Sequence, residues 1–147
     1  MSIPPSIQIR IFEPSDIDAA RTLWQRTDGI GLSEADEPSA LARYLSRNPG
    51  SNLVASDGNN IVGTILCGHD GRRGLIHHLA VASTHRRQGI ARQLLRAGQA
   101  ALCNAGIRKC HLLVFKTNES GLAFWRKVGA EERVLLTLFS IGTQNDD

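Results

Sequence analysis

The sequence predicts a mixed α/β domain, in which helices pack on a sheet, and three observations support this class. Segments with the alternating or continuous apolar residues of strands are interleaved with segments whose apolar residues recur every three or four positions, as in amphipathic helices. Clusters of Gly, Asn and Asp separate these segments. In addition, the apolar run at 79–81 passes through a basic, glycine-containing turn directly into a helix pattern.

The N-terminal half is expected to supply one strand, two helices and a hairpin. Residues 7–12 alternate as a first strand. A Pro-Ser-Asp start signal at 14–16 begins a helix with its apolar residues on one face. A Gly-rich, acidic connection over 28–37 leads to a short second helix over 38–47. Two apolar runs within 53–66, joined by a turn, then predict a hairpin.

The C-terminal half is expected to alternate strands and helices. A turn at 70–74 leads into a strand over 75–81, and the central helix extends from about Gly89 to Asn104 before a terminating glycine. A buried strand over 107–115, a helix over 118–128 and a last strand over 132–141 complete the chain. The predicted order is therefore β-α-α-β-β-β-α-β-α-β.

Length and composition are those of one ordinary globular domain covering residues 1–147, with short tails at about 1–6 and 142–147. The first residues lack the basic start and apolar run of a secretory signal, and no apolar run approaches the ~20 residues of a membrane span. The three cysteines are odd in number and have no Cys-x-x-Cys spacing, so we expect small buried thiols. We therefore predict a cytoplasmic protein with no membrane partner.

The positive charge is mild, at +3, but much of it is grouped in the sequence. Such a group suits a polyanionic small molecule. Nucleic acid is the less favoured partner, because aromatic residues make up only 5% of the chain and none interrupts the basic residues. The residues concerned are Arg72, Arg73, Arg86, Arg87, Arg92 and Arg96.

Residues 86–91 have the pattern Arg-x-x-Gly-x-Ala between the strand and the central helix. The first backbone N–H groups of a helix have no intrahelical partner, and together with the helix dipole they attract phosphate. Arg86 and Arg87 add positive charge beside them. A side chain at Gly89 would keep the backbone from closing on the ligand. The pattern therefore predicts a phosphate site.

This pattern resembles the coenzyme A loop of the GNAT superfamily of acyl-CoA N-acyltransferases, in which Arg/Gln-x-x-Gly-x-Gly/Ala holds the pyrophosphate. A second family feature is Asn118, followed seven residues later by the aromatic Trp125 and then by a helix end at Gly129-Ala130. The resemblance covers nearly the whole chain. It implies a GNAT-type fold with splayed central strands and acetyl-CoA as cosubstrate. Scattered His and Cys residues without ligand spacing speak against a structural zinc site.

The resemblance also implies which residues contact the cofactor. The strand before the loop would pair with the pantetheine arm, opposite residues near Val114. Asn118 would contact the amide or phosphate arm of the cofactor, or would simply cap its helix. Trp125 replaces the tyrosine that protonates the leaving thiolate in many members, so a side-chain acid is in doubt. The implied set is Leu79, Ala80, Val81, Arg86, Arg87, Gln88, Gly89, Ile90, Ala91, Asn118 and Trp125.

The attacking amine must lose a proton, and the candidate bases are His77 and His78 in the strand beside the expected thioester. A two-residue period places them on opposite faces of the sheet, and both could instead be structural histidines. His69 and Asp70 are weaker candidates in a nearby turn. The acidic residues at 34, 36 and 37 either attract a cationic amine or form a solvated loop.

We therefore predict an N-acetyltransferase that moves an acetyl group from acetyl-CoA to a primary amine by direct attack in a ternary complex. The sequence does not distinguish between a small molecule and a peptide as the acceptor. A non-catalytic acyl-CoA-binding sensor, suggested by Trp125, and a basic nucleic-acid-binding domain are the alternatives. Many family members are dimers, and the resemblance leaves a homodimer open.

Overall fold

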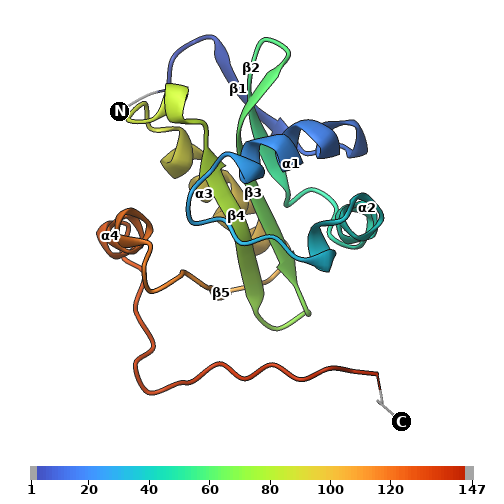
Figure 1. Ribbon diagram of the computed structural model, residues 1–147, viewed down its shortest axis with the longest axis vertical. Helices are drawn as coiled ribbons and strands as arrows, with labels where there is room; N and C mark the ends of the chain where they lie inside the picture. Colours follow the sequence, from blue (N-terminus) through green and yellow to red (C-terminus); the bar gives the residue numbers. More distant parts are fainter. Residues whose placement is uncertain (1–2, 145–147) are drawn as a thin grey trace. The chain divides into compact units, whose positions relative to one another are not determined.

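The computed structural model describes residues 3–144 and contains a five-stranded mixed sheet (Figure 1). The sheet follows chain order, with β1 to β4 antiparallel and β5 parallel to β4. The predicted mixed α/β class is confirmed. The strands are β1 (Ile7–Ile11), β2 (Leu53–Asp57), β3 (Asn60–His69), β4 (Gly74–Val81) and β5 (Cys110–Leu112).

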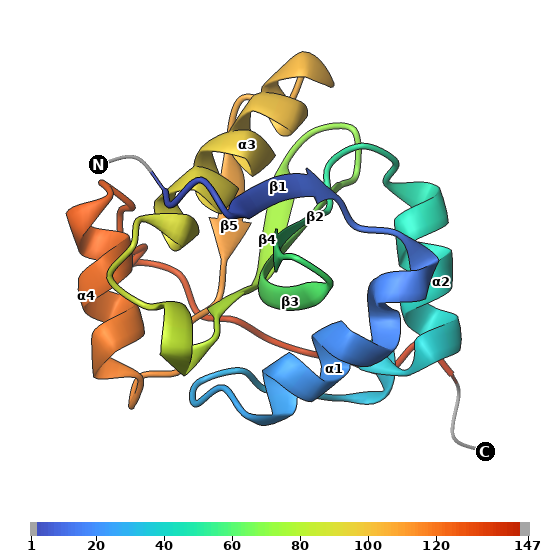
Figure 2. The same cartoon turned by 90° about the horizontal axis from the view of Figure 1, so that it is seen from above.

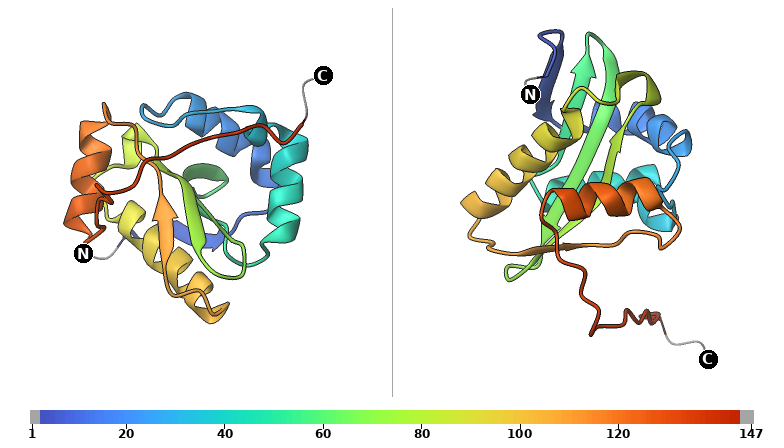
Figure 3. Two further views of the ribbon diagram at one scale, coloured as in Figure 1. Left: turned by 90° about the horizontal axis from the view of Figure 1, so that it is seen from below. Right: turned by 90° about the vertical axis from the view of Figure 1, so that its left-hand side faces the viewer.

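Contacts divide the chain into two compact units, Met1–Phe115 and Lys116–Asp147, and the first holds the entire sheet. Helices cover both faces of this sheet (Figure 2). Helices α1 (Ile17–Gln25) and α2 (Pro38–Arg47) lie on one face, and α3 (Ile90–Asn104) lies on the other, as the views in Figure 3 also show. Each helix has one apolar face, as the sequence period predicts.

The two faces of the sheet have separate cores. On the α1 and α2 face, Trp24 and Leu41 are buried against Val54 and Leu66 of the sheet. Helix α1 is anchored at its start by Asp16, whose carboxylate accepts two hydrogen bonds from Arg10, at 2.8 and 2.9 Å, and one from the backbone of Glu13. Helix α1, and with it Trp24, is therefore held firmly against the sheet.

On the opposite face, Gly98 brings α3 close to the sheet. A Cβ atom at this position would lie only 2.7 Å from the Sγ atom of buried Cys67. We expect Gly98→Leu to destabilise the protein by about 1–3 kcal/mol, because the added atoms must push α3 away from a packed core. Urea denaturation measures the change. Ala100→Leu adds a leucine to an exposed position of the same helix and should have little effect; equal stability losses in the two variants would contradict the close packing.

A β-bulge interrupts the pairing of β3 with β4. Thr64 lies opposite Ala80 and Leu66 lies opposite His77, so the single residue between Thr64 and Leu66 faces two residues of β4. His78 is one of these two, and its φ angle of 49° is in the left-handed region, which non-glycine residues seldom adopt. A bulge redirects side chains and breaks the alternation of faces.

Two predicted strands differ from the structure. The strand predicted over 107–115 is shortened to Cys110–Leu112, because pairing with β4 stops after Ile76. The last strand, predicted over 132–141, is wrong. A strand needs a partner for its backbone groups, and this segment has only local turn bonds, such as that from Val134 N to the carbonyl of Glu132.

The remaining elements agree with their predictions to within a few residues. In the second unit, α4 (Glu119–Lys127) falls within the predicted helix over 118–128. Cys103 is exposed rather than buried, because it lies on the solvent side of α3. Within residues 3–144, no helix is long and apolar enough to cross a membrane. The outermost parts of both predicted tails, 1–2 and 145–147, lie outside the described residues.

Candidate functional site

The turn between β4 and α3 has the backbone that the sequence motif requires. After β4 ends at Val81, a short 3-10 turn (Ser83–His85) leads to two residues in the left-handed region, Arg87 with φ 62° and Gly89 with φ 81°. Gly89 is the N-cap residue of α3, which begins one residue later than predicted. None of the described side chains caps its first turn, so those N–H groups remain available as donors.

Two contacts hold this turn in place. The Nε2 atom of His85 lies 2.9 Å from the carboxylate of Asp57 at the end of β2. The Nε–H group of Arg86 donates to the carbonyl of Val81 at 3.5 Å. The side chains of Arg86 and Arg87 are exposed, whereas Ile90 is buried and fixes the start of α3. The turn therefore combines a fixed backbone with two solvent-facing cations.

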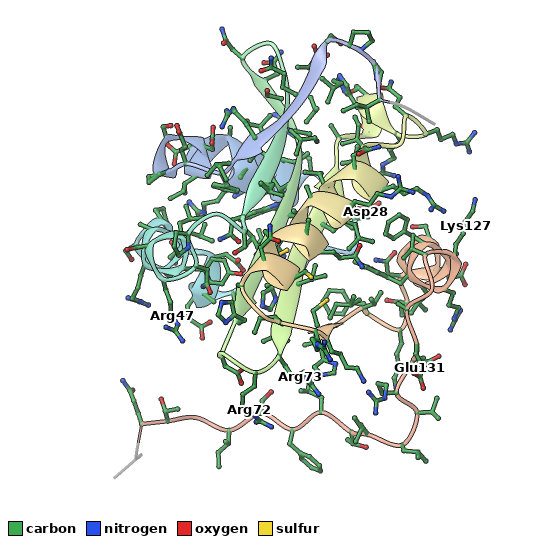
Figure 4. The ribbon with its side chains drawn as sticks, turned by 180° about the vertical axis from the view of Figure 1, so that it is seen from behind. Asp28, Arg47, Arg72, Arg73, Lys127 and Glu131 are labelled. Atoms are coloured by element: carbon green, nitrogen blue, oxygen red, sulfur yellow. The ribbon has the colours of Figure 1, made fainter. Side chains whose placement is uncertain are left out.

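The structure divides the predicted arginine cluster. Arg72 and Arg73 lie in the β3–β4 hairpin turn (Figure 4), before β4 begins, whereas Arg86 and Arg87 follow its end. Since β4 is 8 residues long, the two groups are separated by ~25 Å at about 3.3 Å per residue. The sequence prediction failed here because the strand between the two groups is extended.

His69 and Asp70 are part of the same distant hairpin. The Asp70 carboxylate accepts hydrogen bonds from the backbone of Arg72 and Arg73, at 2.8 and 2.9 Å. These bonds, from Arg73 first, lower the pKa of Asp70. Asp70 therefore stabilises a turn, and neither residue lies at the end of β4 that leads into α3.

Strands β4 and β5 separate toward the turn that connects β4 with α3. Their pairing covers only Gly74–Ile76 of β4 and Cys110–Leu112 of β5. Beyond these residues, Ala80 and Val81 of β4 still pair with β3, but 79–81 have no partner in β5. The predicted splay of the central strands is present, and within residues 3–144 no strand pairs with the backbone edge expected to face the cofactor.

The two histidines of β4 lie on the same side of the sheet, which corrects the prediction of opposite faces. Their ring centroids are 6.3 Å apart. The ring of His78 lies 4.6 Å from that of Trp24 of α1. The bulge at His78 is the physical cause, because it cancels the two-residue alternation on which the prediction depended.

His77 and His78 have different surroundings. The side chain of His77 is exposed, yet nearby protein atoms lower its pKa by desolvation, and the charge of His78 lowers it further. His78 is largely buried, and its Nε2 atom lies 2.7 Å from the Oδ1 atom of Asp36. Sequence reasoning missed this pair, because no spacing rule relates a loop carboxylate to a strand histidine 42 residues away.

The second unit contains Asn118 and Trp125. The Oδ1 atom of Asn118 accepts a hydrogen bond from the backbone of Gly121 at 3.0 Å, so Asn118 caps α4 as its alternative role predicted. The rings of Phe124 and Trp125 pack edge to face with centroids 5.2 Å apart. The proposed contacts of Asn118 and Trp125 with the cofactor stay predictions.

Comparisons with known proteins agree with this geometry. A family model described as the acetyltransferase (GNAT) family matches residues 17–130. An acetyltransferase of Pectobacterium atrosepticum is 34% identical over 132 residues, which cover 90% of this chain and 93% of the relative. These similarities extend over most of the chain and include both motifs.

Solved structures show the same fold. An acetyltransferase from Streptococcus agalactiae has a TM-score of 0.76 at 15% identity, covering 97% of this chain and 95% of its own. The PaiA N-acetyltransferase of Thermoplasma acidophilum, solved in complex with coenzyme A, has a TM-score of 0.71 at 22% identity, covering 84% of this chain and 88% of its own. The GNAT-type fold is thereby confirmed.

Proposed function

We propose that this chain, which belongs to the acetyltransferase (GNAT) family, transfers an acetyl group from acetyl-CoA to a primary amine by direct attack in a ternary complex. The family membership makes it an acetyl-CoA-dependent acetyltransferase. One observation carries the proposal for the site. The uncapped start of α3 follows a turn with two left-handed residues, at the end where β4 leaves β5.

The residues of this turn fit a diphosphate. The N–H groups of residues 88–91 would donate to its oxygens, and the exposed guanidinium groups of Arg86 and Arg87 would balance its charge. The unpaired edge of Leu79, Ala80 and Val81 would pair with the amides of the pantetheine arm, as a neighbouring strand would. We also assign Asn118 and Trp125 to the cofactor, on the family resemblance alone.

The acceptor amine needs a base near neutral pH, because a free alkylamine has a pKa of about 10. We assign this role to the imidazole pair His77 and His78, which share one side of the sheet. One imidazole takes a proton from the ammonium group, which frees the nitrogen lone pair to attack the acetyl carbon, and the bonded nitrogen then loses a second proton to water. The bond from that carbon to sulfur then breaks, and the electron pair leaves with the thiolate.

No side-chain acid is needed for the leaving group. A thiol with a pKa of about 8.5 leaves adequately as thiolate and can take its proton from water. The indole of Trp125 is not an acid near neutral pH. Tyr44 is also unsuitable, because burial raises the pKa of its hydroxyl.

The acceptor is proposed to be the amine of a small molecule or a peptide. A thiol-release assay with acetyl-CoA, run across amines, amino acids and peptides, tests this proposal. We expect at least one class of primary amine to release free thiol and to yield an acetylated product by mass spectrometry. Coenzyme A binding without product from any acceptor would instead favour a sensor.

A further inference from the structure

Asp36 differs from the other acidic residues of its loop. Glu34 and Glu37 are exposed, whereas Asp36 is only 8% exposed. Its Oδ2 atom accepts a hydrogen bond from the backbone of Ser33 at 3.0 Å, and its Oδ1 atom lies 2.7 Å from Nε2 of His78. Both carboxylate oxygens therefore have a defined partner, and the solvated-loop interpretation fails for this residue.

His78 is held from several sides at once. The hydroxyl of Thr64 donates to its backbone carbonyl at 2.7 Å, and the indole N–H of Trp24 donates to that hydroxyl at 2.8 Å. The imidazole also packs 4.6 Å from the ring of Trp24. A non-glycine residue at a φ of 49° persists only where neighbouring contacts over-determine it. Helix α1 and the loop of Asp36 thus fix the imidazole of His78, and β3 fixes its backbone.

The hydrogen bond to Asp36 also determines which ring nitrogen carries the proton. An ionised carboxylate is only an acceptor, so neutral His78 must carry its proton on Nε2. Its Nδ1 atom then has a free lone pair. Among the described residues, Nδ1 of His78 makes no hydrogen bond. It is not among the buried side-chain polar atoms that lack a partner, so Nδ1 has some contact with solvent. It is therefore the nitrogen that can accept a proton from outside.

We infer that Asp36 is a positioning residue that holds His78 in the Nε2–H tautomer, so that Nδ1 of His78 accepts the proton of the acceptor amine. This inference rests on the proposed acetyl transfer. The proton moves from the ammonium nitrogen to Nδ1, and Asp36 stabilises the resulting imidazolium through Nε2. The imidazolium returns its proton to water after the product leaves.

His77 is the poorer base of the two. Its ring has no hydrogen-bonded carboxylate among the described residues, and desolvation together with the charge of His78 lowers its pKa, while the charge of Asp36 offsets this only in part. The titratable groups that face His78 are Asp36 from the loop before α2 and His77 from its own strand. Helix α1 and strand β3 present only the neutral Trp24 and Thr64.

The tautomer can be measured in the unmodified full-length protein. Long-range ¹⁵N–¹H correlation spectra, recorded above the imidazole titration and assigned with His78→Gln, should show His78 protonated on Nε2. Protonation on Nδ1 would overturn the inference. This measurement needs no substrate and no variant of Asp36. It therefore establishes the tautomer of His78 even if a variant of Asp36 fails to fold.

Asp36→Asn tests the role in catalysis. The asparagine side chain has one amide oxygen. If that oxygen accepts the hydrogen bond from the backbone of Ser33, the NH₂ group faces Nε2 of His78 and donates to it, which places the imidazole proton on Nδ1. We expect kcat at neutral pH to fall on the order of 10²- to 10⁴-fold, as when a catalytic histidine takes the wrong tautomer. The KM for acetyl-CoA should not change, and the deficit should shrink as the pH approaches the pKa of the amine.

Glu34→Gln is the matched control, because it removes one negative charge from the same loop but leaves both hydrogen bonds of Asp36 intact. It should keep the wild-type pH profile. If both variants shift the profile equally, the loop acts through charge and the inference is wrong. A wild-type profile in Asp36→Asn would also overturn it, yet leave acetyl transfer intact. Failure of the wild-type protein to acetylate any amine would instead refute the proposed function.

Discussion

Gly89→Val should abolish the measurable binding of coenzyme A while the protein stays folded. Gly89 caps α3 with a φ angle of 81°, a conformation that a β-branched residue adopts only with strain. The valine must either distort the turn or extend two methyl groups toward the ligand. Loss of the N–H contacts, at about 1.5–3 kcal/mol for each bond to a charged group, would weaken binding by orders of magnitude. Calorimetric titration with coenzyme A measures this loss of affinity.

Gly106→Val is the control for backbone strain. Gly106 follows the other end of α3 with a φ angle of 86°, and nothing lies within 4 Å of its Cβ position. Both substitutions should therefore reduce stability by a similar amount, about 1–3 kcal/mol. Only Gly89→Val should lose the ligand. Equal affinity in the two variants would show that the cofactor binds elsewhere.

Removing both imidazoles should have the second large effect. We expect the double variant H77A/H78A to lower kcat at pH 7 on the order of 10²- to 10⁴-fold, the usual contribution of a general base. Desolvation lowers the pKa of His77 below its ordinary value, which favours the unprotonated imidazole that a base requires. Near pH 10 the amine is neutral without help, and the variant should approach the wild-type rate. A pH–rate profile tests this expectation.

His111→Ala is a suitable control for the histidine variants. His111 lies on β5, where it pairs with Leu75 rather than with the bulged part of β4. It should retain the wild-type profile. A double variant that loses rate equally at all pH values would mean that the histidines support the structure and do not accept the proton.

The sequence predicted correctly those elements that depend on interactions between residues close together in the chain. The apolar period of α2 and its proline start predicted Pro38–Arg47 with the observed bounds. The motif at 86–91 predicted a turn at Gly89 and the start of α3 within one residue. The amphipathic period and the signals that start and end a helix depend on a few neighbouring residues, so they can be interpreted without knowledge of the tertiary structure.

The misjudged features depend on partners distant in the chain. The segment 132–141 has the composition of a strand, but composition supplies no backbone partner. The bulge at His78 arises from the register with β3, and the pair of Asp36 with His78 forms only when a loop reaches the sheet. Arg72 and Arg86 were grouped because they are near in sequence, although an extended strand separates them.

The most direct test of the phosphate turn is a titration of ¹⁵N-labelled protein with coenzyme A, followed through its backbone amide resonances. We expect the largest shifts at the N–H groups of residues 88–91, with smaller shifts along 79–81. Coenzyme A that binds tightly yet leaves the amides of 88–91 unchanged would contradict the assignment of the cofactor to the start of α3.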